Sequence, residues 1–284
     1  MKAAGIYSEI FASLTANQAL FPALPEITIR VRQTLGDPDC SIASAAKLLN
    51  QDPGLSAFIM RLANSVRYLT RVPPKDLSAA LRRIGLPTAS HLATSFAIRS
   101  SFDTPSPKLK RLLLESYRKS TRVSVISYFF ANQFRGFPPG KAMLGGLLQD
   151  IGLPPILQRL AERPEIFDDP EQRDAAVDEL APMVGVLILK KWGFDDEMVE
   201  VVRSRKQWLR DPGEEADMAD IVLIARLHSL IGTPEFVDCP PFDQVPAFHK
   251  LPFGELTPDQ SLKMLEDARE ELADLERLMS GAAS

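Results

Sequence analysis

The sequence contains few of the side chains that most often bind metals, with two cysteines and three histidines among 284 residues. Cys40 and Cys239 lie far apart and belong to no CxxC pair, which excludes a cysteine-rich zinc site and fits a reducing compartment. No window approaches the ~18 uninterrupted apolar residues that a membrane span requires, and the N-terminus has no apolar core of signal-peptide length. We therefore expect a cytoplasmic protein that folds without disulfides or metals.

Neither sign of charge dominates the sequence. Thirty-three basic residues stand against thirty-seven acidic ones, which gives a net charge of -4. A general nucleic-acid binder is usually strongly basic, so we expect neither that activity nor membrane association. The P-loop and the G-x-S-x-G nucleophile motif are also absent. A chain of this length can still bury roughly three quarters of the surface that it exposes when unfolded, in one or two domains.

Helical periodicity is the main structural signal. From residue 6 to about 232, apolar residues recur at spacings of three and four with almost no alternating runs, which predicts an all-α fold. Ser41 is a predicted N-cap, and Asp52-Pro53 places a capping carboxylate before a proline at the first helical position. The expected helices cover residues 24–35, 42–50, 53–63, 76–84, 88–102, 106–134, 154–163, 169–193, 196–208 and 217–230.

Two segments suggest how the chain is divided. A polar break at 101–106 places one boundary, so we expect an N-terminal helical subdomain at 1–105 and a second helical subdomain at 106–232. Residues 233–284 follow as a proline-rich segment and a last helix. The prolines between 234 and 258 predict an irregular strap that lies against the body to cover its phenylalanines. A capping box at Thr257–Gln260 opens the last helix, whose apolar seam favours packing on its own domain.

The stretch Met143–Gly152 ends an apolar helical run with the polar pair Gln149-Asp150. It can be read as a simple helix end, with Gly152 as terminator and Pro154 starting the next element.

The long helix expected at residues 106–134 carries basic residues mostly off its apolar stripe. We interpret them as a solvated basic face, comprising Lys108, Lys110, Arg111, Arg118 and Arg122.

Three motifs in order carry a family resemblance: the run 48–55 around Asp52-Pro53, the run 61–65 ending in Ala-Asn-Ser, and the run 77–85 ending in Gly85. Together they resemble the HDOD family, the HD-related output domains, over about residues 18–230. Leu81 and Ile84 stand where the family has Ile and Leu. The resemblance implies an all-α fold, with an N-terminal helical bundle packed on a degenerate HD-type bundle, and a role in bacterial signal transduction.

The resemblance also implies which residues replace the metal ligands of HD phosphohydrolases. Gln149-Asp150 stands at the His-Asp pair, Arg205-Lys206 at a His-His pair, and the other positions fall at Lys119, Ala181 and Arg226. Among these side chains only Asp150 can still ligate a metal well, since an amide oxygen is a poor ligand. We therefore expect no cofactor and a non-catalytic module that binds a partner protein or a small signal. The alternatives are a metal-dependent phosphohydrolase with an atypical site and a sensor of cyclic dinucleotides or other anionic nucleotides.

Lys119 leads to a more specific hypothesis. Helical spacing turns it toward the same side as Val123 and Ile126. Its ammonium could then stand where the metal stood, in an ion pair with Asp150 that is extended by Arg226. The alternative is that Lys119 reaches solvent and Asp150 merely caps a nearby helix.

Overall fold

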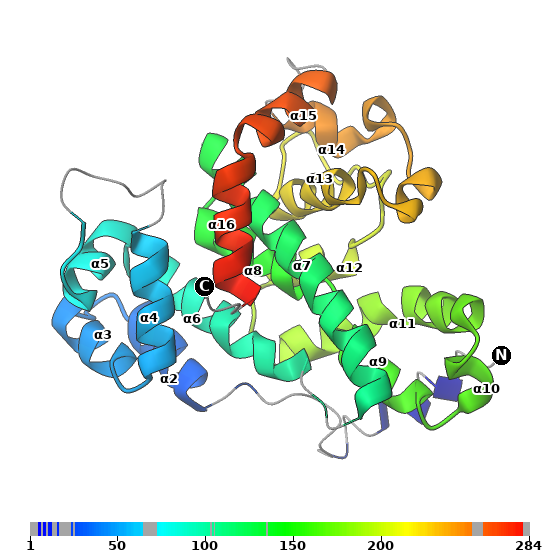
Figure 1. Ribbon diagram of the computed structural model, residues 1–284, viewed down its shortest axis with the longest axis horizontal. Helices are drawn as coiled ribbons and strands as arrows, with labels where there is room; N and C mark the ends of the chain where they lie inside the picture. The colour runs from blue at the N-terminus through cyan, green and yellow to red at the C-terminus, as the bar shows by residue number, and fades with distance from the viewer. Residues whose placement is uncertain are drawn as a thin grey trace.

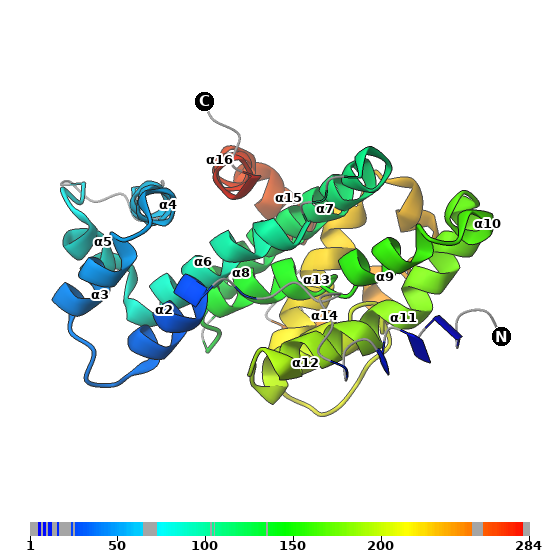
Figure 2. The same ribbon diagram turned by 90° about the horizontal axis from the view of Figure 1, so that it is seen from below.

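The computed structural model describes residues 26–64, 73–102, 106–134, 136–251 and 258–280, together with Thr104 and a few positions before residue 26. Helices make up the regular structure of these ranges and no strand occurs in them, which confirms the all-α prediction. The early helices α2 to α5 gather at one end of the molecule, and α9 to α11 lie toward the other (Figure 1). A view from below shows the long helix α7 crossing the middle (Figure 2).

The N-terminal helices are α2 (Glu26–Gly36), α3 (Ile42–Leu49), α4 (Pro53–Ala63), α5 (Leu77–Ile84) and α6 (Leu86–Ile98), followed by the 3-10 helix η2 (Arg99–Phe102). Two of these helices begin directly after the capping residues that the sequence predicts, Ser41 and Asp52. The Ser41 hydroxyl accepts a hydrogen bond from the Ser44 amide at 3.1 Å, and the Asp52 carboxylate accepts one from the Leu55 amide at 2.9 Å. Gly85 ends α5 at a φ of 84°, a left-handed conformation that favours glycine.

The second half is built around α7 (Pro107–Gln133). It packs against α8 (Pro139–Leu148), α9 (Leu153–Leu160) and α13 (Met218–Leu230). The remaining helices here are α10 (Pro164–Phe167), α11 (Pro170–Lys191) and α12 (Asp196–Arg203). α12 is shorter than predicted, since it ends at Arg203 and the chain continues in turns past Trp208.

The contact between α7 and α8 is unusually close. An ideal Cβ at Gly146 would lie 2.6 Å from Ser124 Cα, so the two backbones approach where neither side has a bulky group. The Ser124 hydroxyl donates to the Met143 carbonyl at 2.6 Å across the same contact. This packing fixes the C-terminal end of α8, where Gln149 and Asp150 lie buried.

The proline-rich segment differs from the irregular strap that the sequence predicted. It forms η3 (Pro234–Asp238), η4 (Phe242–Gln244) and the short helix α14 (Pro246–Lys250). Proline is well tolerated at the first position of η3 and α14, and Pro241 directly precedes η4. Its packing prediction is confirmed for Phe242 and Phe248, which are buried, whereas Val237 is 85% exposed. Phe253 and Thr257, with the predicted capping box, lie outside the described residues.

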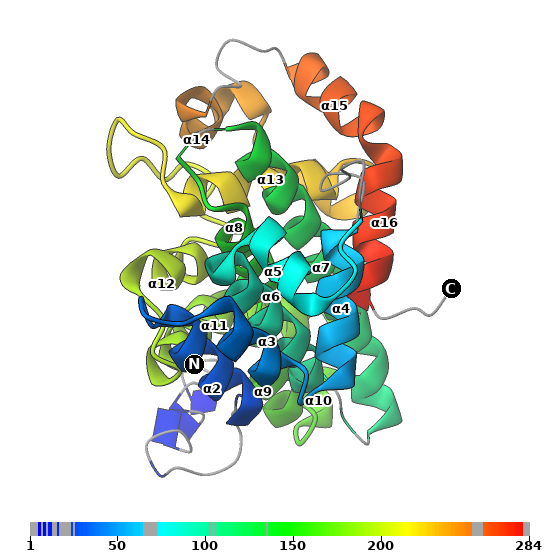
Figure 3. The same cartoon turned by 90° about the vertical axis from the view of Figure 1, so that its left-hand side faces the viewer.

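The last predicted helix is in fact two, α15 (Pro258–Asp267) and α16 (Arg269–Ser280), separated at Ala268. α16 lies along α7 and also contacts α4, so it connects the two halves of the chain (Figures 1 and 3). Leu275 and Met279 are buried in this contact, as expected for a seam that packs on its own domain. One hydrophobic cluster runs from α2 to α16 and crosses the proposed subdomain boundary at residues 105–106. That boundary and the one at 232–233 stay predictions. None of the described helices is long and apolar enough to span a bilayer.

Candidate functional site

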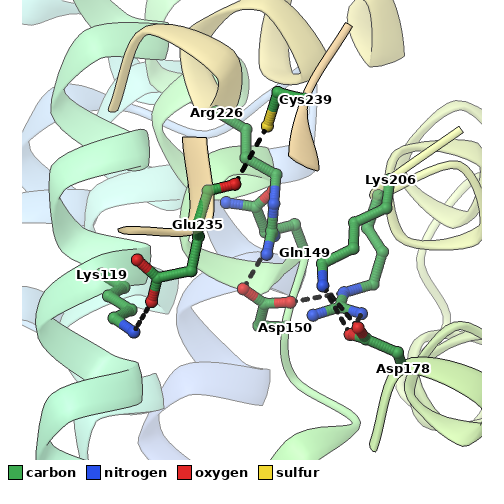
Figure 4. Close-up of polar contacts among 9 residues, drawn as sticks. Lys119, Gln149, Asp150, Asp178, Lys206, Arg226, Glu235 and Cys239 are labelled. Carbon is green, nitrogen blue, oxygen red and sulfur yellow. Dashed lines mark hydrogen bonds and ion pairs between the residues drawn. The ribbon is translucent and has the colours of Figure 1, made fainter. Parts of the chain in front are cut away.

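Two arginines hold Asp150, which lies in the turn after α8. Arg205 Nε donates to Asp150 Oδ1 at 2.5 Å, and Arg226 Nη1 donates to Asp150 Oδ2 at 2.9 Å (Figure 4). Arg205 comes from the turns after α12 and Arg226 from α13, so three separate elements meet at one carboxylate. All three side chains are almost completely buried. Each carboxylate oxygen therefore already has a cationic partner.

Gln149 supports one of these arginines. Its Oε1 accepts a hydrogen bond from Arg226 Nη1 at 3.0 Å, and its Nε2 donates to the Gly146 carbonyl at 3.1 Å. A neutral amide supplies both an acceptor and a donor, so it pairs with one nitrogen of the guanidinium and with the end of α8 at once. The residue that replaces histidine in the resemblance thus has a structural role in holding Arg226.

A second carboxylate extends the network. Asp178, on α11, accepts hydrogen bonds from Arg205 Nη1 at 3.2 Å and from Lys206 Nζ at 2.6 Å (Figure 4). We call the whole network the arginine cluster; its members are Gln149, Asp150, Asp178, Arg205, Lys206 and Arg226. It holds three cations and two carboxylates, so it carries one excess positive charge with both acids ionised.

The arginines keep Asp150 ionised in spite of its burial. Burial alone would raise the pKa of the Asp150 carboxyl, but the charges and hydrogen bonds of Arg205 and Arg226 outweigh it, and the pKa lies well below its ordinary value. Burial also lowers the pKa of Arg226, an effect that Asp150 opposes. The carboxylate and the two guanidinium groups are thus charged together at neutral pH.

Lys119 does not form the ion pair that we hypothesised with Asp150. Its side chain is 53% exposed, and Nζ lies 2.8 Å from Glu235 Oε1 and 3.2 Å from Glu115 Oε1. The hydrogen bond from Lys119 brings the pKa of Glu235 down to about 2. The hypothesis was therefore wrong about the cation, although Arg226 does pair with Asp150. The alternative was right about Lys119 and wrong about Asp150, whose side chain forms ion pairs rather than a helix cap.

Ala181 lies next to the arginine cluster but takes no part in it. It is fully buried on α11, and its carbonyl oxygen would lie 2.4 Å from an ideal Cβ at Gly152. A glycine at 152 thus lets the turn after Asp150 approach α11 closely. The structure brings Gln149, Arg205 and Arg226 together at Asp150, and keeps Lys119 and Ala181 apart from that carboxylate.

The residues present do not fit the divalent metal of an HD phosphohydrolase. Such a site needs several unpaired neutral or anionic ligands around one point, whereas both oxygens of Asp150 contact guanidinium groups. A cation approaching Asp150 would be repelled by Arg205 and Arg226, which also occupy its space. Within the described part of the chain, no three His, Cys, Asp or Glu residues gather as a ligand set.

A cavity of about 490 Å³ opens beside the arginine cluster. Its lining comes from α7, the turn at Asp150, α13, the start of η3, and α16, and consists of Arg118, Lys119, Thr121, Arg122, Val123, Asp150, Arg226, Ser229, Leu230, Thr233, Glu235 and Glu276. Arg118 and Arg122 are exposed, as expected for a solvated basic face, yet they also line this cavity. The sequence offered one signal for this: Arg118 and Arg122 lie four residues apart and on either side of Lys119. Nothing in the sequence indicated that Asp178, Glu235 or Glu276 belongs here.

Comparison with known proteins gives the same architecture. A protein of Shewanella amazonensis SB2B named "Putative metal-dependent phosphohydrolase" is 26% identical, with 98% of each chain covered and a TM-score of 0.76. An HDOD domain protein of unknown function from Geobacter sulfurreducens is 19% identical, with 95% of this chain and 97% of that chain covered and a TM-score of 0.65. An uncharacterized protein of Treponema pallidum is 21% identical over 271 residues, and this chain spans about half its length, with 90% of this chain and 50% of that relative covered. Residues 21–208 match the HDOD domain, and the chain therefore belongs to the HDOD family.

Proposed function

We propose that this protein is a non-catalytic signal-transduction module that acts by binding a partner protein or a small signal. The observation that carries this proposal is the pairing of Asp150 with Arg205 and Arg226. Catalysis of the HD type requires that carboxylate as a metal ligand, and here both its oxygens are engaged by guanidinium groups. The HDOD fold supports the signalling class, since a related structure from Marinobacter aquaeolei VT8 is named a putative signal transduction protein.

Binding is the activity that such an arrangement can still perform. The arginine cluster joins the end of α8, α11, the turns after α12, and α13, so these elements are held in one arrangement by charged contacts. α16 then connects this region to α4. A ligand that prefers one arrangement of these elements would change the surface offered to a partner.

Metal content and hydrolysis test the proposal together. The purified protein should contain well below one iron, manganese or zinc ion per chain by elemental analysis. It should leave nucleotides and bis(p-nitrophenyl) phosphate intact after addition of each metal. The opposing candidate is a phosphohydrolase with an atypical site, which the name of the Shewanella relative favours. About one bound metal per chain, with hydrolysis that is lost in Asp150→Asn and when the metal is removed, would establish that candidate and end ours.

A further inference from the structure

The cavity beside the arginine cluster has a charged end and an apolar side. Arg118, Lys119 and Arg122 line it from one turn of α7, and the nearly buried Asp150 and Arg226 line it as well. Figure 4 shows Lys119 and Glu235 on one side of Asp150, Lys206 and Asp178 on the other, and Arg226 above it. Exposed basic side chains of α7 therefore line the cavity on its solvent side, and the ion pair between Asp150 and Arg226 lines it inside the fold.

The four cations of the cavity differ in how far they are neutralised. Lys119 contacts Glu115 and Glu235, and Arg226 contacts Asp150. Arg118 and Arg122 form no ion pair with any other described residue, although they lie one helical turn apart and line the same space. Two guanidinium groups at this spacing can direct donors at one tetrahedral anion.

We propose that this cavity binds an organic phosphate, with the phosphate group on Arg118 and Arg122 and the body of the ligand inside. The proposal rests on the binding function proposed above and names the class of the small signal. Arginine is the side chain best suited to phosphate, because its planar fork donates two parallel hydrogen bonds. A simple inorganic anion would leave most of the 490 Å³ unfilled.

The remaining lining suits a planar or apolar ligand body. Val123 of α7 and Leu230 of α13 provide apolar lining, and Ser229 and Thr233 add hydroxyl groups to it. Both hydroxyls already donate to backbone carbonyls, of Arg226 and Leu230, so each keeps its lone pairs to accept from ligand N–H or O–H groups. The volume lies within the ~300 to 1,000 Å³ of typical small-molecule sites. A nucleotide combines these properties: a phosphate, hydroxyls and a flat base.

Glu276 gives the site a connection to the rest of the fold. Its half-buried carboxylate lines the cavity from α16 and is attracted by the charge of Arg122. A phosphate on Arg122 would stand against this carboxylate, and like charges in a partly buried site repel. Binding should thus act on α16, the helix that contacts both α7 and α4. Replacing Glu276 by a neutral amide should in turn strengthen phosphate binding.

Isothermal titration of the 284-residue chain tests the proposal with four probes: inorganic phosphate, GMP, AMP and cyclic di-GMP. We expect at least one nucleotide to bind at one site per chain and at least tenfold more tightly than inorganic phosphate. Arg118→Gln and Arg122→Gln should each weaken that binding about tenfold or more, whereas Glu276→Gln should strengthen it. Arg111→Gln is the matched control, because Arg111 is an exposed arginine two turns earlier on α7 and does not line the cavity.

Two results would overturn the inference. One is the absence of nucleotide binding up to millimolar concentration, and the other is binding that Arg118→Gln and Arg122→Gln leave unchanged. Circular dichroism shows whether each variant is folded, and the exposure of both arginines makes misfolding easy to avoid. This test can be told apart from the test of the proposed function. If neither binding nor hydrolysis is found, only the proposal of a phosphate ligand is rejected. If the bound nucleotide is cleaved in the presence of metal, the proposal of a non-catalytic module is rejected.

Discussion

Arg226 and Asp150 are separated by 76 positions in the sequence and form a 2.9 Å ion pair in which both side chains are nearly hidden from solvent. A lone buried carboxylate would either destabilise the fold or take up a proton, so its counter-charge is a structural requirement. In this chain arginines supply that counter-charge from inside the fold. Asp150 is thereby a junction at which the end of α8, the turns after α12 and α13 are joined by buried charges.

The first prediction concerns the stability of this junction. Asp150→Ala leaves two buried guanidinium groups without their shared carboxylate, so unfolding by urea should require about 3 to 5 kcal/mol less free energy. Lys119→Ala breaks only exposed pairs and should change the free energy of unfolding by about 1 kcal/mol or less. A double-mutant cycle should give a large coupling between Asp150 and Arg226 and almost none between Asp150 and Lys119. The reverse order of the two couplings would contradict the observed arrangement.

The second prediction concerns His228 and acid. Its Nδ1 lies 2.9 Å from the Ile224 carbonyl and its Nε2 lies 2.9 Å from the Ser261 hydroxyl of α15, so the neutral ring donates to the carbonyl and accepts from serine. Burial lowers the pKa of His228 to about 4 from an ordinary value of 6.5. Between these values the unfolded chain binds more protons than the folded one, so stability falls as the pH falls from about 6.5 to 4.

The loss due to His228 should be on the order of 2 to 3 kcal/mol by pH 4. Burial also lowers the pKa of His91 to about 4, so His228→Leu should remove about half of the slope and leave the part due to His91. The measurement is the free energy of unfolding in urea at half-unit intervals between pH 4 and 7.5. His249→Gln is the matched control, since His249 is exposed on α14 and its replacement should leave the slope in place. A slope that is the same in His228→Leu as in the unmodified protein would mean that His228 does not contribute to the acid loss.

The third prediction uses two adjacent glycines of α8. A methyl group at Gly146 would lie 2.6 Å from Ser124 Cα and 2.7 Å from Ser124 N, both of them backbone atoms that cannot move alone. At Gly145 the nearest atom is the end of the Val222 side chain at 3.2 Å, which can adjust. Gly146→Ala should therefore destabilise by about 1 to 3 kcal/mol or more, and Gly145→Ala should be clearly milder. Equal thermal shifts for the two variants would show that α7 and α8 are not packed this closely.

Local features of the fold could be read from the sequence, and the contacts of the site could not. Ser41 and Asp52 cap their helices by bonding to an amide three residues onward, a relation that any sequence displays. The partners of Asp150 lie 55 and 76 positions away, and periodicity says which side of a helix a residue faces but not which helix lies opposite. Lys119 shows the limit clearly. Its pair with Glu115, four residues earlier, was visible in the sequence, whereas that with Glu235 was not.

The last prediction asks whether one substitution can bring back metal binding. Gln149→His restores the residue that the HD resemblance expects, and an imidazole is a good ligand for iron, manganese or zinc. Arg205 and Arg226 nevertheless remain on Asp150, so a divalent cation would still meet two positive charges and an engaged carboxylate. Elemental analysis of Gln149→His purified with added manganese should find much less than one ion per chain.

The comparison variant adds Arg226→Asp to Gln149→His, which removes one guanidinium and supplies a second carboxylate where the HD resemblance places the last ligand. We expect manganese uptake to rise only in this double variant, with a higher melting temperature in the presence of the metal as the second readout. Uptake of about one ion per chain by Gln149→His alone would show that the arginines do not block the site. The missing histidine would then be the only obstacle to a metal at Asp150.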